Sequence, residues 1–352
     1  MEVYMHIFNY DFLQDILLPA QVVNLASNIA SLRIMAENRK QEHAEVFQAL
    51  EQVAKVESVK ASNAIEGIVT TERRLREMVE QGAFPLNHTE AEIAGYRDVL
   101  NEIHSNWRFH DFRESDIRLF HAQMMRLANP EANGAYKSED NVIAETLANG
   151  QRIARFIPVS ANKTAAAMGQ LALAYQLARD NVSINKLLLI PCVILDFLCI
   201  HPFADGNGRL SRLLTLLLLY RNGYDAGKYI SFENQIDLHK QEYYQALKEA
   251  SVDWHGNACH YLPFILNFIM TLYACYSELD KRFAVVNSKR ITKKGRIEAT
   301  LLNSLTPLSK KDICNILPDA SPTTVEAVLG KMLRNGLIMT IGKGRNTRYL
   351  RR

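Results

Sequence analysis

The residues best suited to chemistry lie together in one short stretch, HPFADGNGRLSR, which runs from His201 to Arg212 between two strongly apolar segments. His201 ends the first segment, and an imidazole with a pKa of about 6.5 can act as a general base toward a hydroxyl group. Asp205 follows four residues later, and carboxylates commonly hold a Mg²⁺ ion that also contacts phosphate oxygens. A base and a metal ligand so close together indicate a reaction at a phosphate group.

The middle of the stretch has the features of an anion-binding site. Gly206, Asn207 and Gly208 precede the second apolar segment, where a helix start would offer unpaired backbone N–H groups and a partial positive charge. Glycine also lets the backbone approach a phosphate closely. Arg209 and Arg212, three residues apart, would project from neighbouring faces of the first turn and suit a polyphosphate. The set predicts phosphoryl or nucleotidyl transfer, and the chain has neither a GxxxxGK(S/T) nor a complete GxGxxG motif.

Each of these residues has an ordinary structural explanation when it is taken alone. A His-Pro pair can end a helix, an Asp-Gly-Asn-Gly sequence can form a turn, and arginines are common on protein surfaces. Packing does not explain why all of them gather in one loop between two apolar helices. We therefore prefer the functional interpretation of the stretch as a whole.

The stretch is similar at every position to the signature of the Fic (Fic/DOC) family, HxFx(D/E)GNGRxxR. This resemblance implies a protein adenylyltransferase, which transfers AMP from ATP to a serine, threonine or tyrosine hydroxyl of a target protein with the help of Mg²⁺. It implies that His201 activates the hydroxyl and that Asp205 holds Mg²⁺. The implied catalytic residues are His201, Asn207, Arg209 and Arg212. The implied ATP-binding residues are Gly206, Asn207, Gly208, Arg209, Leu210, Ser211, Arg212, Tyr243, Tyr244 and Ser251.

Several alternatives stay open at this point. The candidate residues bind phosphates rather than a particular base, so the donor could be another nucleotide, or the reaction could be removal of AMP. Tyr243 and Tyr244 could equally be packing residues on one helix face. A nucleotide-binding, DNA-associated regulator without turnover is the alternative from a different class, although the complete signature argues against an inactive site.

A second short stretch, SNAIEG, runs from Ser62 to Gly67 at the end of a long amphipathic segment. Ser62 and Glu66 are four residues apart, so a helix would place them on one face. A glycine that simply ends a helix is the ordinary explanation, although glutamate is slightly unfavourable at that end of the helix dipole. The stretch resembles the inhibitory motif of the Fic family, (S/T)xxxE(G/N). The resemblance implies that Glu66 pairs with Arg212 and restrains the enzyme.

The region between the helical segments, residues 129–160, is rich in glycine, asparagine and proline and contains an Asn149-Gly150 pair. This pattern predicts a β-hairpin. The resemblance implies that the hairpin is a flap, at about residues 151–157, that holds a target segment by strand addition. The implied flap residues are Gln151, Arg152, Ile153 and Ala154. Two departures from the common family pattern, RFIPVSA without a second proline and Lys137 in GAYK, concern target presentation.

The last part of the chain differs in charge and pattern. Residues 281–352 hold 16 Lys+Arg against 4 Asp+Glu, which leaves 25 against 34 for the rest of the chain. The pattern predicts a helix, a turn, a second helix that opens at Ser321-Pro322, and two short strands around Gly342-Lys343-Gly344. This order is similar to a winged helix, whose basic face would contact DNA. A basic module for protein contacts is the alternative.

Helical periodicity dominates the remaining sequence and predicts a mainly α fold. The expected architecture is a helical Fic core with a small β-hairpin flap, plus a C-terminal winged helix. We expect three parts: an N-terminal helical region at 1–105 with the inhibitory motif at 62–67, the Fic core at 106–280 with the signature at 201–212, and the winged-helix-like domain at 281–352.

Composition argues against several other classes of protein. The chain is 48% hydrophobic and 22% charged, with a formal net charge of +3, as globular proteins are. The start shows no signal peptide, and the longest apolar runs contain or border charges and fall short of the roughly 20 residues of a membrane span. The five cysteines form no CxxC pair, which argues against a zinc site and for the cytoplasm. The expected partners are an unidentified target protein, the chain itself as a substrate, and DNA through 281–352. The resemblance also implies a homodimer.

Overall fold

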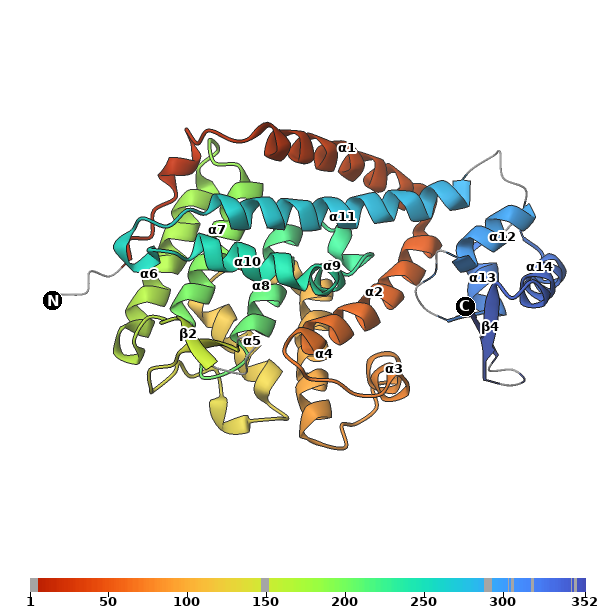
Figure 1. Ribbon diagram of the computed structural model, residues 1–352, viewed down its shortest axis with the longest axis horizontal. Helices are drawn as coiled ribbons and strands as arrows, with labels where there is room; N and C mark the ends of the chain where they lie inside the picture. Colours follow the sequence, from red (N-terminus) through yellow and green to blue (C-terminus); the bar gives the residue numbers. More distant parts are fainter. Residues whose placement is uncertain are drawn as a thin grey trace.

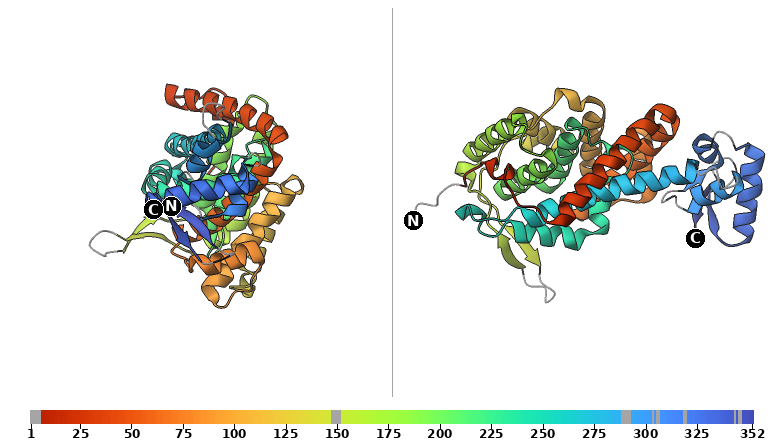
Figure 2. Two further views of the ribbon diagram at one scale, coloured as in Figure 1. Left: turned by 90° about the vertical axis from the view of Figure 1, so that its right-hand side faces the viewer. Right: turned by 90° about the horizontal axis from the view of Figure 1, so that it is seen from above.

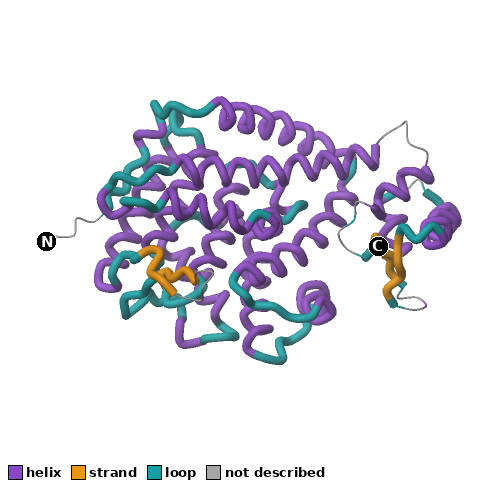
Figure 3. The backbone as a smooth tube through the Cα atoms, viewed as in Figure 1, coloured by secondary structure: helices purple, strands orange, loops and turns teal. Residues whose placement is uncertain are grey.

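The computed structural model describes residues 6–146, 152–287, 293–302, 304, 307–317, 320–342, 344 and 347–352, and within these ranges the chain is mainly helical (Figure 3). The α-helices are α1 Ala20–Glu42, α2 Ala44–Ile65, α3 Glu72–Gln81, α4 His88–Asn106, α5 Glu114–Met125, α6 Ala161–Asp180, α7 Lys186–Ile200, α8 Asn207–Arg221, α9 Phe232–Leu238, α10 Lys240–Ala250, α11 Leu262–Asn287, α12 Lys293–Leu302, α13 Lys310–Ile316 and α14 Pro322–Arg334. The strands are β1 Ile143–Thr146, β2 Arg152–Phe156, β3 Leu308–Ser309, β4 Ile338–Ile341 and β5 Arg348–Arg351. Single 3₁₀ turns lie at Asp11–Leu13, Trp107–Phe109, Pro130–Ala132, Ala226–Lys228 and Trp254–Gly256.

Helices α7 and α8 form the centre of the larger body (Figure 1). They are apolar on nearly every face, and thirteen of the fifteen residues in each are buried, as expected for helices surrounded by other helices. The two pack against each other, α4 and α5 flank α8, and α6 and α11 flank α7. The loop that joins α7 to α8 therefore emerges from the most tightly constrained part of the fold.

The N-terminal helices belong to the same body. One continuous hydrophobic core extends from Tyr10 to Phe283 and includes buried residues of α1, α2 and α4. Helix α1 lies along α11, as the view from above shows (Figure 2). The expected division at residue 105 thus falls within one packed core, and α11 continues this body past residue 280 to Asn287.

Helix α11 does not meet the expectation that every apolar run is too short to span a membrane. Its stretch Leu262–Phe283 is long and apolar enough for that by length and composition alone, and 44% of its most apolar part is buried in the protein. The buried face includes Ile265, Ile269 and Leu272 and packs on α1, α7, α9 and α10. A core helix with this environment needs the same apolar composition.

The predicted hairpin is present. Strands β1 and β2 pair antiparallel, with Ile143 opposite Phe156 and Thr146 opposite Arg152. The Asn149-Gly150 pair and Gln151 lie outside the described residues. The hairpin lies at one edge of the helical body (Figure 2), where Phe156 packs against the core.

The C-terminal domain, residues 293–352, has a separate small core that extends from Ile297 to Ile338. Its elements follow the order α12, β3, α13, α14, β4 and β5, and the strand order in its sheet is β3-β5-β4. Ser321 caps α14 and Pro322 occupies its first turn, as the sequence predicts. Helix α13 packs on α2, while α14 lies on the side away from the larger body (Figure 1).

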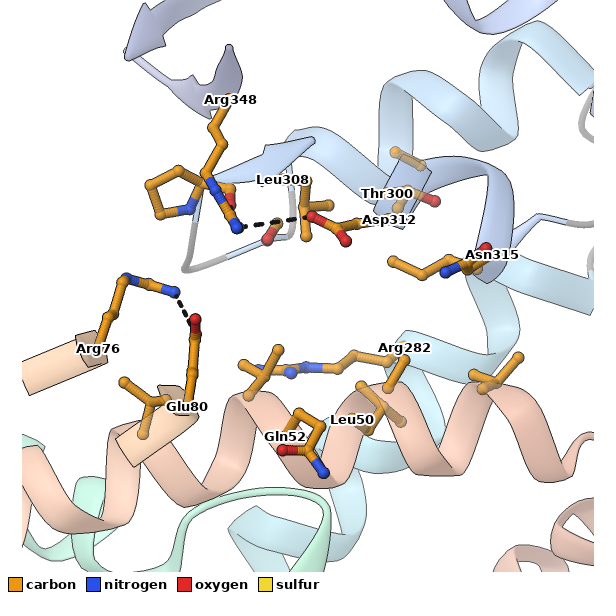
Figure 4. A pocket seen from close by; sticks show the side chains of 18 of the residues that line it. Leu50, Gln52, Arg76, Glu80, Arg282, Thr300, Leu308, Asp312, Asn315 and Arg348 are labelled. Carbon is orange, nitrogen blue, oxygen red and sulfur yellow. Dashed lines mark hydrogen bonds and ion pairs between the residues drawn. The ribbon is translucent and has the colours of Figure 1, made fainter. Parts of the chain in front are cut away.

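A cavity of about 440 Å³ separates the C-terminal domain from α2, α3 and α11. Its lining on α2 is mostly apolar and includes Val46, Leu50 and Val53. Figure 4 shows two ion pairs beside it, Arg76–Glu80 at 3.1 Å and Arg348–Asp312 at 3.5 Å. The contact between the two bodies is therefore incomplete along α2, the helix whose last turn carries Ser62.

Candidate active site

Two residues with positive φ shape the loop between α7 and α8. His201 ends α7 with φ 51° and ψ 63°, and its N–H donates to the Phe197 carbonyl at 2.9 Å. Left-handed backbone costs a non-glycine residue about 1–2 kcal/mol, so the surrounding structure must hold His201 in place. Gly206, with φ 79°, takes the position before α8. Glycine suits this left-handed conformation, and a Cβ there would also lie 2.7 Å from the Met124 methyl group, which would have to shift.

The side chain of Asn207 closes this loop. Its Oδ1 accepts from the Phe203 N–H at 3.0 Å, and its Nδ2 donates to the Phe203 carbonyl at 2.8 Å. Asn207 is buried and does not line the large cavity described below. Both ends of its amide are thus occupied, and Asn207 shapes the loop instead of acting on a ligand as a catalytic residue would.

His201 is the candidate base. It is half-buried, and its Nδ1 is buried without a hydrogen bond of ordinary geometry, which leaves Nε2 as the nitrogen that can reach a ligand. Burial, and next the positive charge of Lys137, lower the pKa of His201 to about 4, against the opposing effects of Leu198, Glu66 and Asp205. The imidazole is therefore neutral, and able to accept a proton, near pH 7.

Arg212 is held by the end of helix α2. Its Nη2 donates to Glu66 Oε1 at 2.8 Å and to the Ser62 carbonyl at 2.9 Å, and its Nε donates to Ser62 Oγ at 2.8 Å. The Arg212 side chain is only 3% exposed, whereas that of Glu66 is 33% exposed. Residues about 150 positions apart in the sequence thus meet at the first turn of α8.

The carboxylate of Glu66 also lies against the start of α8. A Cβ built on Gly208 would lie 2.4 Å from Glu66 Oε1, so only glycine admits this approach. Unpaired N–H groups at a helix start attract anions. In this structure the anion at that position is the Glu66 carboxylate.

Arg209 faces a different acidic pair. Its Nη2 donates to Glu92 Oε1 at 2.9 Å and lies 3.3 Å from Asp205 Oδ2. The Nε and Nη1 atoms of Arg209 are buried without a hydrogen-bond partner. Unsatisfied guanidinium donors beside an exposed Asp205 carboxylate suit a further anionic ligand, because buried charged donors are otherwise costly.

Some of these residues border a cavity of about 900 Å³, a size typical of sites for small molecules and cofactors. Asp205, Gly206 and Arg209 do not line it. The residues that line it and were predicted from the sequence are Glu66, His201, Gly208, Arg212, Tyr243, Tyr244 and Ser251. The cavity also has a hairpin wall, to which Ile143, Ala144, Arg155 and Phe156 contribute. A candidate base, the start of α8, the Arg212 guanidinium and an apolar wall therefore meet in one space.

Other predicted residues lie elsewhere. The side chain of Leu210 is fully buried in the core, and its N–H bonds to the Gly206 carbonyl. Ser211 is buried and donates to the Gly208 carbonyl. Neither side chain can contact a ligand in the cavity without rearrangement. Ile153 and Ala154 are exposed in β2 and do not line the cavity, and the side chain of Arg152 lies outside the described part of the chain.

Four neighbours of the site were not predicted to belong to it. Lys240 lines the cavity and donates to the Ile65 carbonyl at 2.7 Å. Arg155 lies over the Tyr244 ring at 5.6 Å, and its Nε is buried without a partner. His121 stacks on Phe203 at 3.7 Å, and Glu92 holds Arg209. Lys240, which lies within the HKQEYY segment, could have been suspected, but no sequence signal points to Glu92 or His121.

The donor groups fit a magnesium–nucleotide complex. Among the described residues, no cluster of three or more His, Cys, Asp or Glu is arranged to hold a metal, so an ion here would need ligands from the nucleotide itself. The Asp205 side chain is 68% exposed and provides one carboxylate, which matches the way Mg²⁺ binds between one or two carboxylates and phosphate oxygens.

Comparisons with known proteins point to one family. The profile of the Fic/DOC family matches residues 111–219. A "Protein adenylyltransferase Fic" of Nematostella vectensis is 26% identical over 211 residues, which cover 58% of this chain and 44% of that protein. The chain thus matches less than half of that relative. A Fido domain-containing protein of Dictyostelium discoideum is 31% identical over 147 residues, which cover 41% of this chain and 92% of that protein.

Solved structures share the fold. A Fic family protein from Desulfovibrio desulfuricans has a TM-score of 0.60 at 20% identity and covers 96% of this chain and 97% of its own. A Fic domain containing signaling protein from Bacteroides thetaiotaomicron has a TM-score of 0.59 at 24% identity and covers 74% of this chain and 96% of its own. At these identities the likeness concerns the fold, which is mainly helical with small sheets.

Proposed function

Because the chain belongs to the Fic/DOC family, we propose that it is a protein adenylyltransferase that transfers AMP from ATP to a hydroxyl group of a target protein. One observation carries the proposal: the base His201, the glycine-bearing helix start at Gly208 and the Arg212 guanidinium border the same cavity. The name of the Nematostella relative points to the same activity.

The chemistry assigns each group a task. A target hydroxyl oxygen forms a bond to the α-phosphorus of ATP, the bond to pyrophosphate breaks, and His201 Nε2 takes the hydroxyl proton. The helix start and Arg212 bind the phosphates and neutralise their charge, so catalysis is mostly positioning and electrostatics. A Mg²⁺ ion held by Asp205 would supply further charge neutralisation at the phosphates.

The contact of Glu66 with Gly208 and Arg212 supports a restrained resting state. The carboxylate occupies the seat that a phosphate would take, and it engages the guanidinium that a phosphate would use. ATP must therefore displace Glu66 or bind in a shifted position in which its α-phosphate is poorly aligned for attack. We propose that movement of the end of α2 releases the enzyme.

The function is tested by incubating the protein and its Glu66→Gly variant with α-labelled ATP, UTP, GTP or CTP and Mg²⁺, with and without cell lysate. Label on protein, stronger for Glu66→Gly and absent from a His201→Ala, Glu66→Gly double variant, is the expected result. The nucleotide that labels identifies the donor. A folded Glu66→Gly protein that binds nucleotide but labels nothing, and that also removes no AMP from modified proteins, would favour the binding-module alternative.

The C-terminal domain supports a second candidate function. The element order α12–β5 and the position of α14 away from the larger body are favourable for a winged helix that binds DNA with its basic face. Full-length protein should then bind duplex DNA with an affinity that falls steeply as salt rises, and Lys331→Glu with Arg334→Glu should weaken it. Binding that is insensitive to salt and to these changes would instead favour a protein-docking role.

A further inference from the structure

The family pattern assigns Lys137 to target presentation, but the structure instead buries it behind the loop that carries His201. It is only 6% exposed and does not line the cavity. An ammonium group is rarely buried unless its donors are used. Its Nζ donates to Asn141 Oδ1 at 2.8 Å and to the Ile200 carbonyl at 3.2 Å.

The contacts of this segment fall on both sides of His201. The Ile200 carbonyl precedes His201, and the Lys137 N–H donates to the Pro202 carbonyl, which follows it, at 2.9 Å. One residue farther along, the Phe203 carbonyl accepts from Asn141 Nδ2 at 3.3 Å. The segment that leads into strand β1 thus holds three carbonyl groups around the candidate base.

The position of Nζ has an electrostatic consequence as well. Ile200 is the last residue of α7, and the final carbonyls of a helix lack intrahelical partners and attract cations. A positive charge at this point stabilises the helix end and at the same time opposes a second positive charge on the adjacent imidazole.

We propose that Lys137 is a positioning residue for His201, which holds the carbonyls that flank the base and opposes protonation of the imidazole. It acts through His201 and not on the substrate. The activity part of this inference rests on the proposed function, whereas the effect on His201 itself does not.

The charges around both groups agree with this role. Burial is the main reason that the pKa of His201 falls to about 4, and Lys137 is the next cause, whereas Glu66 and Asp205 oppose the shift. Burial lowers the pKa of Lys137 itself to about 8, and Asp140 opposes that shift. Lys137 is therefore charged throughout the range in which His201 would take up a proton.

The experiment is an NMR titration of the full-length protein with ring-¹³C-labelled histidine. The chain has ten histidines, and the His201→Ala variant identifies the signal. Lys137→Gln and Lys137→Met should raise the pKa of His201 by on the order of one unit, a common size for removal of one nearby charge. Lys137→Arg keeps the charge and should titrate like the parent. Asn141→Ala is the matched control, since it removes a hydrogen-bond partner but leaves the charge.

A second readout uses label transfer in the Glu66→Gly background. A rise of one unit from a pKa of about 4 would roughly halve the neutral fraction of His201 at pH 5 and leave it unchanged at pH 7.5. We therefore expect label transfer to fall about twofold at pH 5 and to stay the same at pH 7.5. Folded Lys137→Gln and Lys137→Met proteins whose His201 titrates like the parent would overturn the inference. The titration needs no turnover. If His201 shifts as expected but neither the parent nor any variant transfers label, the result counts against the proposed function alone.

Discussion

Replacing Glu66 by glycine should release the site and weaken the fold only modestly. The change removes the carboxylate from the start of α8 and frees one side of Arg212, which keeps its two hydrogen bonds to Ser62. Glu66 follows the last residue of α2 with φ −91°, so glycine meets no strain there. Glu66→Gln is the matched variant, because it keeps the size of the side chain but removes its charge.

The burial of the two partners sets the magnitude. Removal of one partner from a fully buried pair costs about 3–5 kcal/mol, whereas an exposed pair contributes about 0–1 kcal/mol. With Arg212 at 3% and Glu66 at 33% exposure, we expect a value between these limits, about 1–3 kcal/mol. If ATP must overcome the same interaction, release corresponds to a gain of about 5–150-fold.

The assay compares label transfer from α-labelled ATP for the parent, Glu66→Gln and Glu66→Gly, with denaturant unfolding on the same samples. We expect the rate to rise in that order, because the amide still fills the phosphate seat whereas glycine empties it. Equal rates for the three folded proteins, or a fall in the Glu66→Gly variant, would refute the restraint. A loss of unfolding free energy well above 3 kcal/mol would show that Glu66 is mainly a structural residue.

Three further outcomes follow from the packing and charges. Gly95→Ala should lower the free energy of unfolding by about 2–3 kcal/mol, because its Cβ would lie 1.8 Å from the Met124 carbonyl oxygen. Gly256→Ala is the control: its Cβ would meet open space, so the free energy of unfolding in denaturant should change by less than about 0.5 kcal/mol. Arg209→Lys should reduce label transfer at least about tenfold, since an ammonium group cannot reproduce the guanidinium that bridges Glu92 and Asp205. Wild-type rates in this variant would remove Arg209 from the site. Stability should fall as the pH drops from about 6.5 toward 4, because burial lowers the pKa of four histidines to about 4 and the unfolded chain binds more protons in that window. Thermal unfolding across this range measures whether stability falls. The buried Asp196, whose pKa burial raises to about 7, partly opposes this loss of stability. The four histidines are His6, His104, His121 and His201.

The features that the sequence determined by itself are local. The glycine at position 206 and the apolar runs on both sides predict a turn between two buried helices, because backbone freedom and hydrophobic periodicity act over a few residues. The same holds for the hairpin and for the helix that opens at Ser321. The candidate base and metal ligand could be named for this reason, since the rest of the fold does not change their spacing within one loop.

Only the tertiary structure decided which groups act on that loop. Arg209 meets Glu92 across 117 residues and His201 lies against the segment of Lys137 across more than 60, and no periodicity links such positions. The pairing of Glu66 with Arg212 came from resemblance, not from spacing. The same packing turned Asn207 and Leu210 inward, although their places in the motif suggested ligand contacts. Long-range contacts depend on how whole helices pack, so the charges that tune a site emerge only when the core is assembled.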